Sequence, residues 1–205
     1  MSTASLANLS FRLNRVGGYS NILPGVILLT DTERLPDPLP AAAALPPGSA
    51  VILRHYDDPG RETLGRDLLA LCRQRGLKLL VAGDWRLAWK LGAHGVHLPE
   101  WQLRRPPPRR RTANWLITAA AHSPKALIQA ARLGADAALL SPVFATASHP
   151  GASGIGLQQF ARAVRRAPIP VYGLGGIHEG NAHRLKHCGI AGIAAISGLA
   201  DEASD

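Results

Sequence analysis

The chain has 205 residues, which is enough for one sizeable core, and 46% of them are hydrophobic while 18% are charged. This composition excludes wholesale disorder and favours one packed domain. The formal net charge of +9 suits a nucleic acid, a membrane surface or an anionic small molecule, so charge alone selects no partner.

The first 24 residues precede the first predicted strand, and we expect them to form an N-terminal extension that covers the bottom of the fold. They lack the apolar stretch of a signal peptide, and no later segment reaches about 18 uninterrupted apolar residues. The two cysteines, Cys72 and Cys188, lie far apart without paired ligand spacing, so we expect neither a disulfide framework nor a zinc site. These features predict a cytoplasmic protein with no membrane partner.

Short apolar runs bounded by turn residues recur along the chain, and the stretches between them have helical character. Such runs are typical of parallel strands buried on both faces. The predicted strands begin at Val26, Ala50, Lys78, Gly95, Asn114, Ala137, Pro170 and Gly192.

Eight such strands with crossover helices predict an α/β fold, a closed (β/α)8 TIM barrel forming a single domain over residues 25–200, followed by a tail at 201–205. An open doubly wound sheet is the alternative, but it lacks support because no GxGxxG follows the first strand.

The clearest crossover helices are predicted at 60–75, 86–92, 123–133, 157–166 and 178–187. The first crossover is proline-rich, and only AAAAL at 41–45 can make a helical turn. The fourth contains a basic run, Arg104 to Arg111, that prolines interrupt, so it cannot form a continuous basic helix. We expect a solvated loop there and no nucleic-acid partner, because no nucleic-acid fold signature accompanies the run.

Glycine-rich turns follow the last two predicted strands. The seventh strand ends in GLGGI with Gly175 and Gly176, and the eighth ends in ISGLA, where Ser197 and Gly198 open a short terminal helix. Glycines let backbone amides approach an anion closely, and barrels of this kind commonly bind phosphate at these loops. One such loop would be an ordinary tight turn, but two on adjacent strands favour phosphate binding.

Polar side chains also follow other strands. His122 ends the fifth strand beside three alanines, where an imidazole is either structural or a carrier of protons between carbon atoms or between carbon and nitrogen. Arg54 ends the second strand and suits either a ligand anion or a salt bridge across the barrel top. Thr146, Ser148 and His149 follow the sixth strand and are either ligand contacts or an ordinary surface loop. No cluster has metal-ligand spacing, so we expect metal-free chemistry without a cofactor.

The order of motifs resembles thiamine phosphate synthase and its relative, the TenI thiazole tautomerase, from Val26 to Leu199. The resembling strings are VILLTD, LAWKLGAHGVHLP, HSPKALIQAARLGADAALLSPVFATASHPG, PIPVYGLGGI and AGIAAISGLA. This resemblance implies a barrel that binds a small phosphorylated thiazole.

The synthase uses magnesium to join a pyrimidine diphosphate to thiazole phosphate, and the residues at its polar and metal-binding positions differ in this chain. By the resemblance, these positions hold Ile52, Tyr56, Ala82, Gly83, Glu100, Gln102, Ala120 and His149. The magnesium site is therefore not predicted here.

The TenI branch needs no metal and handles thiazole phosphate carboxylate. By this resemblance His122 is the proton carrier, the glycine-rich loops hold phosphate, and Arg54 faces the carboxylate. A divergent synthase and a non-catalytic phosphate-ligand binder remain as alternatives. The sequence leaves the oligomeric state open, a homo-oligomer included.

Overall fold

The computed structural model of the protein describes residues 3–104, 115–145 and 154–199. Eight parallel strands close into one barrel, because β1 pairs with β8 as well as with β2. The strands are β1 Val26–Leu29, β2 Ala50–Leu53, β3 Lys78–Ala82, β4 Gly95–Leu98, β5 Leu116–Ala121, β6 Ala137–Leu140, β7 Val171–Leu174 and β8 Gly192–Ala195. The predicted TIM barrel is therefore confirmed.

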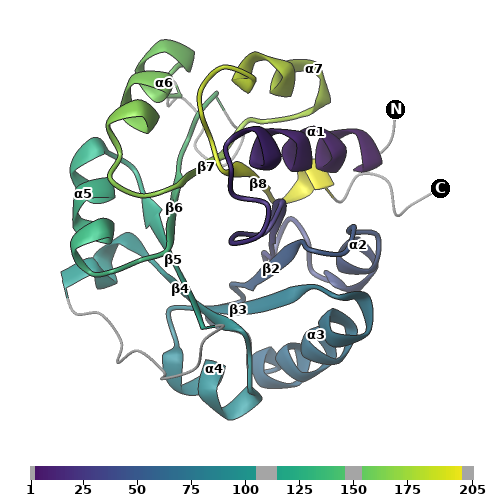
Figure 1. Cartoon of the computed structure of the whole chain (residues 1–205). Helices are drawn as coiled ribbons and strands as arrows, with labels where there is room; N and C mark the ends of the chain where they lie inside the picture. Colours follow the sequence, from purple (N-terminus) through teal and green to yellow (C-terminus); the bar gives the residue numbers. More distant parts are fainter. Residues whose placement is uncertain (1–2, 105–114, 146–153, 200–205) are drawn as a thin grey trace.

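Helices surround the barrel in the order that right-handed crossovers require (Figure 1). The α-helices are α1 Thr3–Val16, α2 Leu39–Ala43, α3 Arg61–Arg75, α4 Trp85–Leu91, α5 Pro124–Arg132, α6 Leu157–Arg166 and α7 Glu179–Ala182. Single 3₁₀ turns are η1 Glu100–Arg104, η2 His183–Leu185 and η3 Ser197–Leu199. The predicted helix at 178–187 is thus shorter than expected and breaks into α7 and η2, in a segment where Gly180 weakens helix formation.

The strand residues are buried on both faces, as the apolar runs require. Every residue of β1, β2, β4, β6 and β8 is buried. One face of each strand packs against its neighbours inside the barrel and the other packs under the helices, so the apolar runs need not alternate with polar residues.

The last turn of the N-terminal helix α1 reaches the bottom of the barrel, where Asn14 bonds the Pro24 and Ala191 carbonyls just before β1 and β8 begin. The helix packs along the outside of β8 and β1, beside α7, where a helix following β8 would otherwise lie (Figure 1). Its buried positions, Leu6, Ala7, Ser10, Leu13 and Asn14, recur at helical spacing and form one face toward the strands. The described chain after β8 contains only the η3 turn, so α1 supplies the cover that β8 needs.

Candidate functional site

A cavity of about 1220 Å³ opens at the carboxyl ends of the strands. Six of the predicted site residues line it: Arg54, His122, Gly175, Gly176, Ser197 and Gly198. They come from four strand ends, and the barrel brings them together because all parallel strands end at the same face. Thr146, Ser148 and His149 lie outside the described residues.

His122 is fixed by the end of β6. Its Nδ1 lies 3.1 Å from the carbonyl oxygen of Ser141 and 3.2 Å from the Ser141 hydroxyl. A carbonyl oxygen can only accept, so this bond requires the proton of a neutral His122 to be on Nδ1. The lone pair is then on Nε2, which has no hydrogen-bond partner within the described part of the chain. In this tautomer Nε2 can accept a proton.

The backbone of His122 is held as well. Its N–H donates to Oε2 of Glu100 at 2.7 Å, which ties the end of β5 to the η1 turn. Ser123 accepts from the Ala126 amide at 3.2 Å and caps α5, with Pro124 in the first helical turn. The imidazole therefore projects from a backbone that is bonded on both sides.

Glycines shape the opposite wall of the cavity. Gly175 and Gly176 have φ values of +92° and +65°, and a Cβ on Gly176 would collide with the carbonyl oxygen of Ala145. The Leu174 and Gly175 carbonyls accept bonds from the amides of Val143 and Phe144, at 2.9 and 3.1 Å. The C=O and N–H of one peptide unit point in opposite directions, so the Gly175 and Gly176 amides point away from the β6 loop. Amides oriented in this way can donate to an anion in the cavity, which both glycines line.

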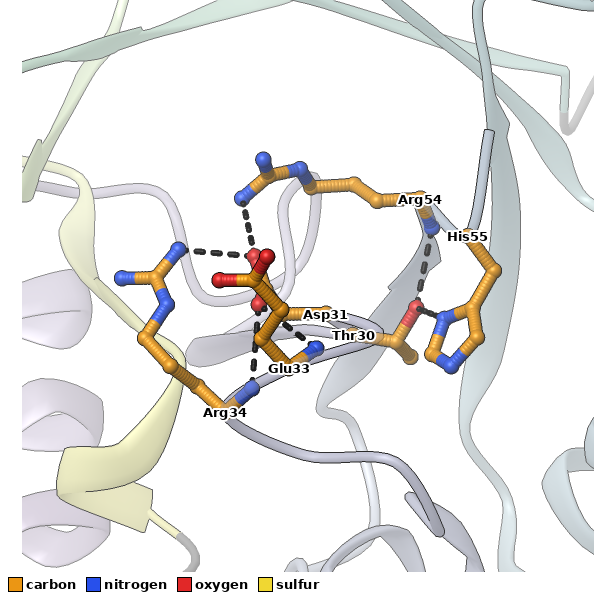
Figure 2. Close-up of polar contacts among 6 residues, drawn as sticks. All are labelled: Thr30, Asp31, Glu33, Arg34, Arg54 and His55. Atoms are coloured by element: carbon orange, nitrogen blue, oxygen red, sulfur yellow. Dashed lines mark hydrogen bonds and ion pairs between the residues drawn. The ribbon is translucent and has the colours of Figure 1, made fainter. Parts of the chain in front are cut away.

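Arg54 belongs to a polar cluster at the ends of β1 and β2 (Figure 2). Its amide donates to Thr30 Oγ1 at 2.9 Å, and its guanidinium lies 3.6 Å from Oδ2 of Asp31. Arg34 bonds the same oxygen at 2.7 Å. Burial opposes ionisation of Asp31, but hydrogen bonds from Arg34 and the charges of both arginines outweigh it and lower its pKa to about 2.

The sequence reasoning missed Asp31 and Arg34. The signal was present, because the first apolar run, VILLTD, ends in an aspartate at the strand end where barrel sites lie. Arg34 lies three residues further on, and its side chain lines the cavity because the chain turns after β1. Asp31 fixes this turn by accepting the backbone amides of Glu33 and Arg34.

The cavity wall is basic. It carries the arginines Arg34, Arg54 and Arg104 and the lysine Lys125, whereas Glu100 is the one acid among the described lining residues. His97 also lines the cavity but stays neutral, because complete burial and the nearby Arg54 charge lower its pKa to about 3. Such a surface attracts small anions.

The residues at the synthase's metal positions do not fit a magnesium diphosphate. Gln102 donates to the Gly83 carbonyl at 2.7 Å, and the Tyr56 ring packs over Gly83. Asp84, the nearest carboxylate in sequence, accepts the Leu87 amide at 2.9 Å as the N-cap of α4. Magnesium prefers several carboxylate oxygens, and among the residues described here no three His, Cys, Asp or Glu side chains form a metal-binding group.

These observations define a class: a (β/α)8 barrel with a basic cavity walled by two glycine-rich strand ends. Residues 27–199 match the family described as thiamine monophosphate synthase. The chain belongs to this family, which serves thiamine biosynthesis.

Individual relatives agree with the family assignment. The chain is 33% identical over 188 residues to the thiamine-phosphate synthase of Thiobacillus denitrificans, covering 86% of this chain and 87% of the relative. It is 32% identical over 164 residues to the thiamine-phosphate synthase of Thioalkalivibrio sulfidiphilus, covering 77% and 78%. Among solved structures, the thiamine phosphate pyrophosphorylase of Pyrococcus furiosus is similar with a TM-score of 0.69 at 27% identity, covering 84% and 85%.

Proposed function

We propose that the protein is a TenI-like isomerase that shifts a proton within thiazole phosphate carboxylate without a metal or cofactor. The observation that carries this proposal is the bond from His122 Nδ1 to the Ser141 carbonyl, which leaves Nε2 as the base facing a basic cavity. An isomerase needs one group that both accepts and returns a proton, and an imidazole does this near neutral pH.

The phosphate of the substrate would lie against Gly175, Gly176, Ser197 and Gly198. Backbone amides at these positions stabilise a dianion without a bulky side chain between them. Thr146, Ser148 and His149 would add polar contacts from the β6 loop. Anchoring the phosphate holds the thiazole in one orientation, so the reacting carbons face the same side of the cavity throughout.

The proton transfer would then use His122 alone. Nε2 removes a proton from one carbon of the substrate, and the resulting imidazolium keeps its Nδ1–H bond to Ser141, which strengthens as the ring becomes charged. Negative charge spreads toward the substrate carboxylate, where Arg54 compensates it. Nε2 finally returns the proton to a second carbon.

A divergent synthase is the second candidate, and the names of the relatives favour it. That reaction needs magnesium and a diphosphate leaving group, yet the corresponding positions hold Gly83, Gln102 and Tyr56. Removing most of the cationic and acidic partners of a diphosphate should cost many orders of magnitude in rate.

The two reactions separate in one assay. Purified protein is incubated with thiazole phosphate carboxylate alone, and then with pyrimidine diphosphate and magnesium added. We expect isomerisation in the first incubation and no thiamine phosphate beyond the uncatalysed level in the second. Thiamine phosphate formation would restore the synthase assignment, and binding without either reaction would indicate a non-catalytic ligand binder.

A further inference from the structure

One carboxylate holds two arginines at the wall of the cavity. Oδ2 of Asp31 receives the Arg34 guanidinium at 2.7 Å and the Arg54 guanidinium at 3.6 Å (Figure 2). Oδ1 accepts the backbone amides of Glu33 and Arg34 at 3.3 and 3.1 Å, which fixes the turn after β1. Asp31 therefore orients both the turn and the two side chains.

Two guanidiniums share one carboxylate oxygen in this cluster, and guanidiniums that meet the same oxygen lie close enough to repel each other. Both line the cavity, with side-chain exposures of 35% for Arg34 and 29% for Arg54. A carboxylate entering from the cavity would reduce the repulsion between the two guanidiniums, and its two oxygens match the planar donor fork of an arginine.

We propose that Arg34 and Arg54 form a two-guanidinium clamp for the ligand carboxylate, and that Asp31 is the residue that positions both. The proposal rests on the proposed function and adds Arg34 and Asp31 to the site. Because β1 lies between β2 and β8 in the barrel, the clamp neighbours the glycine-rich end of β8. The cluster thus selects ligands that carry a carboxylate in addition to a phosphate.

The direction in which Asp31→Asn changes ligand affinity distinguishes a positioning role of Asp31 from a purely electrostatic one. Asp31→Asn keeps an oxygen that can accept the two turn amides but removes one negative charge next to the cavity. If Asp31 acted only through its charge, an anionic ligand would bind more tightly to the variant. If Asp31 positions the arginines, the ligand binds more weakly, because the guanidiniums separate and lose their shared partner.

The test compares the affinities of thiazole phosphate and thiazole phosphate carboxylate by calorimetry. Wild type should prefer the carboxylated compound by about tenfold or more, the effect of charge-assisted hydrogen bonds. Arg34→Met, Arg54→Met and Asp31→Asn should each lose most of this preference while retaining affinity for thiazole phosphate. Arg75→Met is the matched control, because it removes an exposed guanidinium at the end of α3 and should keep the preference.

Two results overturn the clamp. Tighter binding of the carboxylated compound by Asp31→Asn would reduce Asp31 to a repulsive charge, and a full preference in Arg34→Met would leave Arg54 acting alone. Thermal unfolding of each variant identifies any that has lost its fold, and the Arg34 and Arg54 variants decide the matter if Asp31→Asn fails to fold.

A second experiment distinguishes failure of the clamp proposal from failure of the proposed function. If wild type binds neither phosphorylated compound, the proposed function fails, and thiazole-2-carboxylate is titrated while the arginine side-chain ¹⁵N signals are followed by NMR. Saturable, joint shifts of the Arg34 and Arg54 signals that disappear in Asp31→Asn would uphold the clamp. Signals that do not move would overturn it.

Discussion

His97 and His122, two of the three histidines that line the cavity in the described part of the chain, differ because their surroundings differ. His97 is buried and bonds Thr118 Oγ1 at 2.9 Å, and burial keeps it neutral. His122 is exposed to the cavity and has only its Nδ1 side engaged. A proton carrier must reach solvent or substrate in both charge states, so His122 alone of this pair suits that role.

Substitution of Ser141 tests which Ser141 atom fixes the His122 tautomer. Ser141→Ala removes the hydroxyl but keeps the carbonyl that accepts from Nδ1, so we expect the isomerisation kcat to stay within about threefold of wild type. Steady-state kinetics check this, with Ser123→Ala as a control that removes a helix cap instead. A loss of about a hundredfold in Ser141→Ala would assign the orienting bond to the hydroxyl.

The low pKa of Asp31 predicts pH-dependent stability. The folded-state pKa of about 2 lies below the ordinary value of 3.8, so ionised Asp31 stabilises the fold fully above about pH 4 and progressively less as the pH falls toward 2. Allowing for solvent screening, we expect Asp31→Asn to lower the free energy of unfolding by about 1 to 2 kcal/mol at pH 7. Urea unfolding from pH 7 to 3 should show this gap narrowing below pH 4.

The exposed Asp67→Asn is the control for that series and should change stability by less than about 0.5 kcal/mol. A gap for Asp31→Asn that is unchanged down to pH 3 would contradict the role of its ionised carboxylate.

At the scale of elements, the glycine-rich end of β7 depends on backbone geometry that only glycine meets without strain. Gly176 combines a positive φ with a close approach to the β6 loop, whereas Gly189 has a φ of +75° and nothing within 4 Å of a built Cβ. Substituting Gly176 and Gly189 in turn therefore distinguishes two effects. The cost of a positive φ applies at both positions, and the cost of a steric collision applies only at Gly176.

Alanine substitution of the two glycines gives the corresponding prediction. Gly189→Ala should lower the free energy of unfolding by about 1 kcal/mol, the cost of positive φ, and leave ligand affinity unchanged. Gly176→Ala should cost more than this and weaken thiazole phosphate binding at least about tenfold, because the loop must shift. Chemical unfolding and calorimetry measure the two effects, and equal behaviour of both variants would remove the loop from the binding site.

The helices and strands that could be predicted are those whose sequence signal lies within or directly beside the element. The strands follow apolar runs, so their positions agree with the sequence within about two residues, and helices with a clear start, such as α5 after Ser123, also agree. The position of α1 was not predictable because its polar contacts are distant in sequence: Ser10 bonds Gly25 and Ile193. The partner that fixes the His122 tautomer, Ser141, also lies far away in the sequence, at the end of the next strand. It could not be predicted for that reason.

At the scale of the whole molecule, α1 joins the two chain regions that close the barrel. Asn14 donates to the Ala191 carbonyl at 2.6 Å and to the Pro24 carbonyl at 3.2 Å, just before β8 and β1 begin. Tyr172 of β7 donates to the same Pro24 carbonyl at 2.6 Å. No helix of the described chain is long and apolar enough to cross a membrane.

Loss of the Asn14 side chain should therefore destabilise barrel closure. Asn14→Ala leaves the buried Ala191 carbonyl without this partner and should cost about 1 to 3 kcal/mol in the free energy of unfolding. Arg12→Ala, on the exposed face of the same helix, should change it by less than about 0.5 kcal/mol. Equal stabilities in urea unfolding would mean that α1 is dispensable for closure.

The most direct test of the account is proton transfer by His122. Thiazole phosphate carboxylate is incubated in D₂O with EDTA and either wild type or His122→Asn, and isomerisation and carbon-bound deuterium are followed by NMR. We predict metal-independent isomerisation with deuterium incorporation by wild type, and a rate at least about a hundredfold lower for a folded His122→Asn variant. Equal rates for the two proteins, or no isomerisation by wild type, would contradict the account.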